Sequence, residues 1–347
     1  MHCSVAMSTY NGERFLAEQL SSVCRQTRPV DEIVISDDGS SDRTLEIIEE
    51  YKSANPQIRW NVLTAPENQG FRKSFRRAIM HCGGELIFLC DQDDVWMENK
   101  VERTLKLFEA NAQMLSLISD FKTIDAQGRF LRPEASTENL WVSDRVLRSA
   151  SMPAKITLSE MLGRNQGQGC AMALRRSLAE EYIGLEQSWT HDWIINLLAA
   201  MHGGLYYCSE QLIAYRLHGK NVIGMAQGEH AQRQVSLSRR LYDWALAFKY
   251  SFLKGDGEAC RAGLMSVSMD KYEYVFDRVV CSGEEAAQRD AFVALQNQRL
   301  MLIEKKKLLS YGLFFLKNRT FFAENAYFAT PEQVAIRVML DLCAMLK

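Results

Sequence analysis

The sequence predicts an α/β protein with a mostly parallel, Rossmann-like β-sheet and helices on both faces. Strand-like apolar runs alternate with helical patterns four times in the first third of the chain, which is the pattern of such a fold. The run at residues 85–90 is almost wholly apolar and indicates a strand buried on both faces. The acidic turn Asp91-Gln92-Asp93-Asp94 follows it at once.

Four strands are predicted in this region, and each leads through a polar turn into a helix. The strands are placed at residues 3–8, 32–36, 60–63 and 85–90. Asn11 is expected to cap the first helix, and Ser41 or Asp42 the second. The apolar faces of the four helices include Leu16, Leu20 and Val23; Leu45 and Ile48; Phe71, Phe75 and Ile79; and Val101, Leu105 and Phe108.

The pattern is weaker in the middle of the chain and changes near its end. Residues 120–167 are expected to be irregular, followed by a strand at 167–174, a helix through Ile194 and Met201, and a strand at 212–216. Beyond residue 225 only long helical patterns remain. We therefore predict an α/β catalytic domain over residues 1–225 and an α-helical C-terminal region over 226–347.

Composition narrows the class of protein. The 347 residues are 47% hydrophobic and 24% charged, as in a globular protein, and a net charge of −2 gives no sign of a nucleic-acid-binding surface. Nine cysteines without a CxxC pair predict buried thiols in a reducing compartment and no zinc site. The first strand begins close to the initial methionine, which leaves no room for a signal peptide, and no apolar run approaches the roughly 20 residues of a membrane span. We expect a cytoplasmic protein.

The acidic turn at 91–94 is unusual because it places three carboxylates within four residues. Like charges this close repel each other, and hard cations such as Mg²⁺ or Mn²⁺ relieve that repulsion by binding oxygen ligands. A second acidic turn, residues 37–42, also follows a strand, so both are expected at the same edge of the sheet, where ligands bind in such folds. The alternative is a solvated turn in which Asp93 or Asp94 caps the next helix.

Four segments together resemble the inverting, nucleotide-sugar-dependent glycosyltransferases of family 2, whose fold is called GT-A. They are residues 8–13, 37–42, 68–70 (Asn-Gln-Gly) and 91–94, in this order at strand ends. The later segments 191–193 and 215–219 resemble the branch that includes bacterial rhamnosyltransferases of surface-polysaccharide synthesis. The resemblance covers roughly residues 3–225.

This resemblance implies a metal-dependent transfer of a sugar from dTDP-rhamnose or a UDP-sugar to a saccharide acceptor, lipid-linked, in capsule, O-antigen or exopolysaccharide synthesis. It assigns Asp192 as the catalytic base and His191 and Trp193 as acceptor-contacting or orienting residues. It assigns Mg²⁺ or Mn²⁺ to Asp93, with Asp91 and His218 as further ligands, while Asp94 is a weaker candidate. The nucleotide-binding positions are Ser8, Thr9, Tyr10, Asn11, Asp37, Asp38 and Asp91.

Each of these residues also has a structural interpretation. Asp192 can be a first-turn acid favoured by the helix dipole, Tyr10 a half-buried aromatic residue, and His191 or His218 a histidine with a purely structural hydrogen bond. A nucleotidyltransferase is the alternative enzyme, but residues 9–13 are not the glycine-rich, cationic phosphate loop that it would need. A nucleotide-sugar-binding protein without activity would not need Asp192.

The C-terminal region carries aromatic residues flanked by cations. Lys305, Lys306 and Lys307 precede an apolar stretch that ends at Lys317 and Arg319, and residues 239–254 have the same character. This composition suits the anionic inner surface of a membrane. The competing interpretation is that these residues form core packing or a homo-oligomer contact.

Overall fold

The computed structural model describes residues 1–131, 142–163, 165–185, 190–218, 269–304, 310, 313–314 and 317–318. The chain divides into two compact units, residues 1–157 with 165–226 and residues 158–164 with 227–347. This division adds residues 158–164 to the C-terminal unit. No feature of the sequence pattern indicates that this segment belongs there. Each unit is described separately below.

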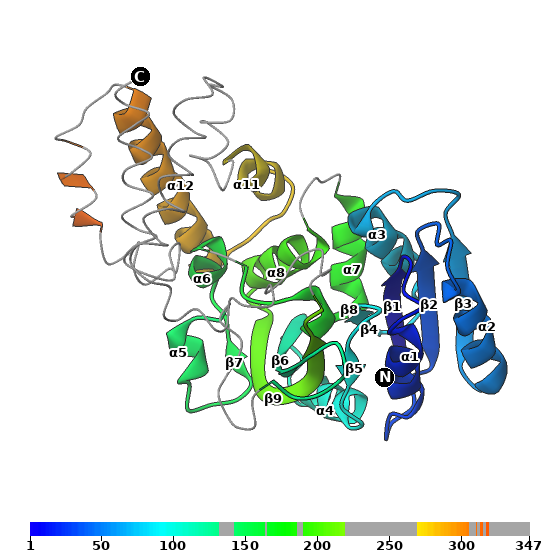
Figure 1. Ribbon diagram of the computed structural model, residues 1–347. Helices are drawn as coiled ribbons and strands as arrows, with labels where there is room; N and C mark the ends of the chain where they lie inside the picture. The colour runs from blue at the N-terminus through cyan, green and yellow to red at the C-terminus, as the bar shows by residue number, and fades with distance from the viewer. Residues whose placement is uncertain are drawn as a thin grey trace, which may run out of the picture. The chain divides into compact units, whose positions relative to one another are not determined.

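One half of the sheet is parallel and contains the four strands predicted first. These strands are β1 (Cys3–Thr9), β2 (Glu32–Asp37), β3 (Arg59–Thr64) and β4 (Leu86–Cys90), in the order β3-β2-β1-β4. The chain moves outward from β1 to β3 and then returns to the other side of β1 (Figure 1). The direction of strand addition therefore reverses between β1 and β4, and ligands bind at such a reversal in doubly wound folds.

The other half of the sheet is mixed. It continues from β4 through β8 (Met172–Arg175), β6 (Ser116–Ile124), β9 (Leu205–Arg216) and β5 (Val95–Trp96), while β7 (Ala154–Lys155) pairs with β9. Only β6 and β9 run parallel here. The predicted strand at 167–174 begins too early, because residues Gly169–Ala171 form a 3₁₀ helix, η1, before β8. The start of the segment expected to be irregular belongs to β6.

Helices cover both faces of this sheet, as predicted. The first unit contains α1 (Leu16–Cys24), α2 (Thr44–Ala54), α3 (Phe71–His81), α4 (Lys100–Ala110), α5 (Asp144–Leu147), α7 (Arg176–Gly184) and α8 (His191–Met201). Right-handed crossovers place α1 and α2 on one face and α3, on the return path, on the other. Helix α3 packs on β1 and β2 and contacts both α7 and α8 (Figure 1).

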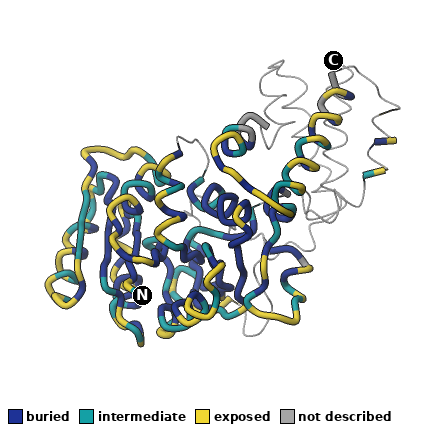
Figure 2. Tube along the Cα trace, turned by 180° about the vertical axis from the view of Figure 1, so that it is seen from behind, coloured by how far each residue is buried: buried dark blue, intermediate teal, exposed yellow. Residues whose placement is uncertain are grey.

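The central strand β4 is buried along its whole length, with every residue from Leu86 to Cys90 at most 1% exposed (Figure 2). Its two faces are covered, which explains the uninterrupted apolar sequence. Because β1, β2 and β4 are parallel, their carboxyl ends lie at one edge of the sheet. The two acidic turns therefore share an edge, as the sequence predicts.

The described part of the second unit is helical. It consists of α6 (Leu158–Gly163), α11 (Met269–Phe276) and α12 (Gly283–Glu304). The hydroxyl of Tyr272 donates to the carbonyl oxygen of Leu162 at 3.2 Å, and its ring meets that of Phe292 edge-on at 5.3 Å. No helix within the described ranges is long and apolar enough to cross a membrane. The cations Lys305–Lys307 and Arg319, and the aromatic stretch at 239–254, lie outside the described residues.

Candidate active site

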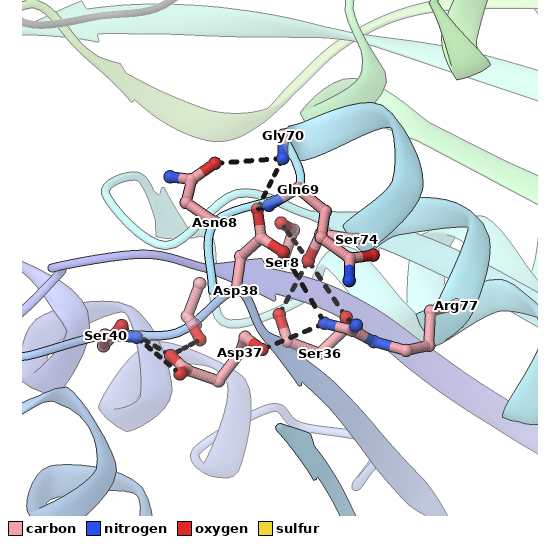
Figure 3. Close-up of polar contacts among 11 residues, drawn as sticks. Ser8, Ser36, Asp37, Asp38, Ser40, Asn68, Gln69, Gly70, Ser74 and Arg77 are labelled. Atoms are coloured by element: carbon pink, nitrogen blue, oxygen red, sulfur yellow. Dashed lines mark hydrogen bonds and ion pairs between the residues drawn. The ribbon is translucent and has the colours of Figure 1, made fainter. Parts of the chain in front are cut away.

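The carboxylate of Asp37 is fixed at the end of β2 by its neighbours. It is fully buried and accepts hydrogen bonds from Thr9 Oγ1 at 2.9 Å, Ser40 N at 2.9 Å and Ser40 Oγ at 2.6 Å (Figure 3). A carboxylate offers about four acceptor positions. Three bonds hold Asp37 in one orientation and leave capacity for a further donor.

The neighbouring Asp38 joins β2 to the turn before α3. Its Oδ2 accepts the backbone N–H groups of Gln69 at 3.0 Å and Gly70 at 2.7 Å (Figure 3). Gly70 has φ +91°, a backbone conformation that side chains disfavour, and its N–H also donates to Asn68 Oδ1 at 2.9 Å. The Asn-Gln-Gly segment therefore serves to present two backbone donors to Asp38.

Arg77 on α3 completes this network, and the sequence analysis did not identify it. Its Nε donates to Ser36 Oγ at 2.8 Å, its Nη2 donates to the carbonyl oxygen of Asp37 at 2.9 Å, and the same nitrogen lies 3.8 Å from Asp38 Oδ1 (Figure 3). On the same helix, Ser74 accepts a hydrogen bond from Ser8 Oγ at 2.8 Å. Ser8 thus contributes to the support of this edge through α3.

The turn after β1 is tied to the acidic turn by a side-chain amide. Gln92 Oε1 accepts the N–H of Tyr10 at 2.8 Å, and Gln92 Nε2 donates to the carbonyl oxygen of Tyr10 at 3.0 Å. Tyr10 is 43% exposed, which fits the half-buried aromatic residue of the alternative interpretation as well as a ring open to a ligand. A Cβ at Gly12 would lie 2.4 Å from Gln92 Oε1, so a larger residue there would displace the Gln92 amide from Tyr10.

The predicted helix-capping role of Asn11 is wrong. Helix α1 begins at Leu16 without a side-chain cap, and Asn11 instead adopts φ +46° and accepts the N–H of Ser41 at 2.9 Å. Asn11 therefore links the turns after β1 and β2. The expected role of Asp42 is closer to the structure, because its Oδ1 accepts the N–H of Thr44 at 3.0 Å, at the start of α2.

The acidic turn at 91–94 is not a solvated capping turn. Asp94 is only 1% exposed and its Oδ1 accepts the N–H of Arg216 at 2.9 Å, whereas α4 does not begin until Lys100. Burial raises the pKa of Asp94 to about 7, with the Asp93 charge adding to the effect. Burial also raises the pKa of Asp91, which lies in the field of Asp94, Asp93 and Asp192. Asp192 is thus among the charges that raise the pKa of Asp91, and the ring of its neighbour His191 lies against Gly169, next to Cys170 in the sequence.

The end of β9 positions the acidic turn. Arg216, 1% exposed, donates from Nε to the carbonyl oxygen of Asp93 at 2.7 Å and from Nη2 to Glu18 Oε2 at 2.5 Å. Two residues later, His218 Nε2 is 2.7 Å from Asp93 Oδ2, and the His218 ring lies on that of Phe15 with 4.8 Å between centroids. The structure thus pairs two of the three predicted metal ligands.

Asp192 lies in the first turn of α8, and its carboxylate is oriented by two donors. Asn165 Nδ2 donates to Asp192 Oδ2 at 2.8 Å, and the N–H of Trp193 donates to Oδ1 at 2.9 Å. Asn165 is itself held by Asn196 Nδ2, which donates to its Oδ1 at 3.1 Å. Asp192 is half-buried, as is Trp193, so its carboxylate combines a fixed orientation with partial access to solvent.

His191, one residue earlier, is buried among apolar groups. It is 5% exposed and stacks on Phe75 with 4.1 Å between centroids and 26° between planes. Burial lowers the pKa of its imidazole, against the charge of Asp192. Neither ring nitrogen has a hydrogen-bond partner among the described residues, and Nε2 lies so close to Gly169 that a Cβ there would be 2.7 Å away. The interpretation of His191 as a structurally satisfied histidine does not fit this environment.

One group of three potential metal-ligand atoms is present in the described part of the chain. It comprises a carboxylate oxygen of Asp91, one of Asp94 and the thiol sulfur of Cys170, all within 4.8 Å of one another. Asp94 Oδ2 is buried and, apart from the nearby Cys170 thiol, has no hydrogen-bond donor within the described ranges. A divalent cation fits this cluster, because it would satisfy that oxygen and offset the repulsion between the carboxylates.

The comparison with known protein families decides the classification. Residues 4–183, just over half of the chain, match the model of the family described as "Glycosyl transferase family 2". The chain belongs to glycosyl transferase family 2. The α/β fold predicted from the sequence, with its largely parallel central sheet, is confirmed as the GT-A type.

Individual relatives agree with the family assignment. An uncharacterised glycosyltransferase of Nostoc sp. is 28% identical over 64% of this chain and 66% of its own length. The dTDP-rhamnosyl transferase RfbG of Shigella flexneri is 27% identical over 63% of this chain and 73% of its own. The chain spans about two thirds or less of the length of the first curated relatives that it matches. The crystal structure of S. aureus TarS residues 1–349 with UDP is similar in fold, with a TM-score of 0.52, 17% identity, and coverage of 80% of this chain and 82% of that one.

Proposed function

We propose that this family 2 protein is an inverting, metal-dependent glycosyltransferase that moves a sugar from a nucleotide-diphosphate donor to a saccharide acceptor. The observation that carries the proposal is the gathering of three sets of groups at one edge of the sheet. Asp37 ends β2 and Asp38 follows it, the acidic turn follows β4, and Asp192 in the first turn of α8 is among the charges that raise the pKa of Asp91. A donor bound at the reversal between β1 and β4 would lie within reach of all three.

The nucleotide would bind over the turns that follow β1 and β2. The exposed ring of Tyr10 offers a stacking surface, and Asp37 keeps capacity to accept an N–H from uracil or thymine. Ser8, Thr9, Asn11 and Asp38 shape this site through the hydrogen bonds described above. The similarity to RfbG supports dTDP-rhamnose as a donor, and the TarS complex with UDP supports a uridine donor.

The proton transfer would be carried out by Asp192. An acceptor hydroxyl attacks the anomeric carbon on the face opposite the leaving group, its proton passes to a carboxylate oxygen of Asp192, and the nucleoside diphosphate departs with the bonding electrons. Asn165 and the N–H of Trp193 orient the carboxylate for this step. The buried nitrogens of His191 provide a hydrogen-bonding group beside it.

The acidic turn would hold a divalent cation, Mg²⁺ or Mn²⁺, with Asp91, Asp93 and His218 as the ligands implied by the family resemblance. A bound cation neutralises charge on the diphosphate as it leaves. Arg216 at the end of β9 holds the acidic turn in place through its hydrogen bonds to Asp93 and Asp94. The carboxylates therefore keep their positions whether or not a cation is bound.

For the acceptor, we propose a lipid-linked saccharide of surface-polysaccharide synthesis. A relative that is 28% identical over 39% of this chain is named for glucosyl transfer to a diphosphoundecaprenol-linked sugar in Escherichia coli, which supports this class. The cations at 305–307 and the apolar residues after them would then bring the protein to the inner membrane surface. Homo-oligomer formation through the same residues is the competing role.

The proposal is tested by separating donor binding from transfer. Asp192→Asn should reduce transfer by about 10²–10⁴-fold, the usual cost of removing a general base, while donor affinity measured by calorimetry is unchanged. Asp93→Ala should abolish both transfer and metal-dependent donor binding, and excess EDTA should do the same to the wild type. Full activity of the Asp93 variant, or equal loss of donor binding in the Asp192 variant, would contradict these roles.

Product analysis separates the alternatives. A glycosyltransferase releases a nucleoside diphosphate from the sugar donor, whereas a nucleotidyltransferase releases pyrophosphate from a nucleoside triphosphate. A non-catalytic binding protein would bind the donor and release neither product in the presence of any acceptor. The turn after β1 contains Tyr10, Asn11, Gly12 and Glu13, which is not a cationic phosphate loop and disfavours the nucleotidyltransferase.

A further inference from the structure

The thiol of Cys170 has no role in the mechanism above, yet it lies in the acidic cluster. Cys170 is on η1, is 2% exposed and is a free thiol. Strand β8 pairs antiparallel with β4 in a register that sets Phe88 opposite Ala173. Extending this register by three residues brings Cys170 opposite Asp91, and η1 indeed packs against β4. The position of the thiol thus follows from sheet pairing.

The groups around the thiol would suit a cation. Its sulfur lies within 4.8 Å of a carboxylate oxygen of Asp91 and of Asp94. Asp94 Oδ1 already accepts the N–H of Arg216, whereas Oδ2 is buried and has, apart from the nearby Cys170 thiol, no donor in the described part of the chain. An unpaired buried carboxylate oxygen is costly unless something satisfies it. Asp91 is half-buried as a residue, whereas Asp94 and Cys170 are buried.

We propose that Cys170 supplies a sulfur ligand to a divalent cation held by Asp91 and Asp94, a set that shares Asp91 with the ligands Asp91, Asp93 and His218 implied by the family resemblance, and so gives the acidic turn a preference for thiophilic cations. Soft thiolate ligands favour Zn²⁺, Cd²⁺ and Co²⁺, whereas carboxylates alone favour Mg²⁺ and Mn²⁺. On binding, the thiol releases its proton to solvent and the sulfur forms the bond to the metal.

A competing role for the same cluster is neutralisation by the protein itself. Lys100 is 1% exposed, its Nζ lies 5.0 Å from the centre of the Trp96 ring, and its charge acts on Cys170, Cys90 and Asp94. If the Lys100 ammonium is the counter-ion of these carboxylates, added cations have no site there. Arg216, Asp93 and Asp91 are further charged groups that act on Asp94.

Cobalt(II) binding to the full-length protein under reducing conditions distinguishes the two. A sulfur ligand produces a near-ultraviolet charge-transfer band that oxygen and nitrogen ligands do not produce. We expect the band in the wild type and its loss in Cys170→Ser and Cys170→Ala. Loss of a residue that only supports a metal ligand costs about 10–100-fold in metal affinity, so loss of a direct ligand should reduce the affinity for Co²⁺ by at least this factor. Asp94→Asn should also weaken Co²⁺ binding. Two variants of Cys170, checked by circular dichroism, guard against misfolding of either one.

The matched control is Cys82→Ser. Cys82 is equally buried but lies just before β4, at the opposite edge of the sheet, where its thiol contacts the carbonyl oxygen of Ala78. This variant should keep the full charge-transfer band. A wild type that binds Co²⁺ without the band, a band that persists in both Cys170 variants, or a wild type that binds no Co²⁺ would each overturn the proposal.

The inference rests on the proposed function only for the presence of a cation at the acidic turn. The cobalt spectrum is independent of glycosyl transfer, so the two can fail separately. A wild type that lacks the band but shows Asp192-dependent transfer would refute the sulfur ligand alone. A normal band in a protein that transfers no sugar would refute the proposed function alone.

Discussion

Arg77 Nη2 donates a hydrogen bond of 2.9 Å to the carbonyl oxygen of Asp37, which ties helix α3 to the carboxyl end of β2. The same guanidinium group reaches Ser36 Oγ and lies 3.8 Å from Asp38. Two aspartates proposed to bind or support the nucleotide are therefore held by one side chain. Arg77 touches no reacting atom and is a positioning residue.

Arg77→Met should weaken nucleotide binding. Hydrogen bonds from a charged group contribute about 1.5–3 kcal/mol, so we expect the Kd for UDP or dTDP, measured by calorimetry, to rise by roughly tenfold or more. Arg77→Lys keeps the charge but cannot form the forked contacts, and it should restore only part of the affinity.

Arg76→Met is the matched control on the same helix. Arg76 donates to the carbonyl oxygens of Tyr182 and Leu185, at the end of α7. Its loss should lower the thermal midpoint while nucleotide affinity stays at the wild-type value. Equal nucleotide affinities in the two Met variants would show that Arg77 has only a structural role.

The stacking of Phe75 on His191 predicts a different kinetic effect. Phe75→Leu keeps an apolar side chain on α3 but removes the ring that lies 4.1 Å from the imidazole. Such aromatic pairs contribute about 0.5–1.5 kcal/mol beyond burial. We expect a two- to tenfold decrease in kcat, because His191 adjoins Asp192, with unchanged nucleotide affinity.

Phe108→Leu provides the comparison for that variant. Phe108 is buried like Phe75, with 1% and 3% of the residue exposed, but its ring lies against Arg175, away from the acidic turn. Both variants should lose stability, and only Phe75→Leu should lose kcat in excess of its loss of folded protein. A parallel decrease in kcat for both would indicate a general packing effect.

Stability should depend on pH through the pair His202–Glu181, which joins the ends of α7 and α8. His202 Nε2 lies 2.9 Å from Glu181 Oε2, and this hydrogen bond raises the pKa of His202 against the opposing effect of burial. A raised pKa in the folded state stabilises the protein below the unfolded pKa of about 6.5, and this contribution disappears as pH rises through the folded value.

Glu181→Gln should therefore lower the free energy of unfolding at pH 5.5 more than at pH 8.5. Both side chains are about one third exposed, so the difference should stay below about 1 kcal/mol. Urea unfolding at the two pH values measures it. An equal loss at both pH values would show that His202 is not charged in the folded protein.

Much of the fold followed from local sequence patterns. The strand at 85–90 could be predicted because burial on both faces requires an uninterrupted apolar run. Its parallel pairing with β1 then placed the turns after β1, β2 and β4 at one edge. The strands β5 and β7 were missed because each has only two residues, which is too few to show the alternating apolar pattern of a strand. The whole of β6 was missed, and residues 120–124 of it fell in a stretch expected to be irregular because turn signals follow close behind.

The support of the site could not be predicted in the same way. Arg77 and Gln92 find partners 40 and 82 residues away, through pairings that only the assembled sheet defines. Cys170 reaches Asp91 through the register of β8 on β4, and the sequence placed a strand where η1 turns. The residue types in the turns predicted the chemistry at this edge of the sheet. The side chains that hold those turns in place could be identified only from the three-dimensional packing.

The last prediction concerns the membrane surface. Within the described residues after α12, Leu313 is 70% exposed and Lys317 is exposed beside it. Lys305, Lys306 and Lys307 precede them in the sequence, and each cation near an anionic surface contributes about 1 kcal/mol. We expect the protein to float with anionic vesicles and not with neutral ones at low salt, where screening is weakest.

Changing Lys305, Lys306 and Lys307 to Glu should weaken this binding by about a hundredfold or more. The matched control changes Arg43, Lys52 and Lys106 to Glu, three exposed cations of the first unit with the same total change in charge. If electrostatics over the whole protein caused the binding, both triple variants would float equally poorly. A wild type that stays in the soluble fraction with anionic vesicles at low salt would instead assign these residues to core packing or to contact with a second copy, which sedimentation analysis would then detect.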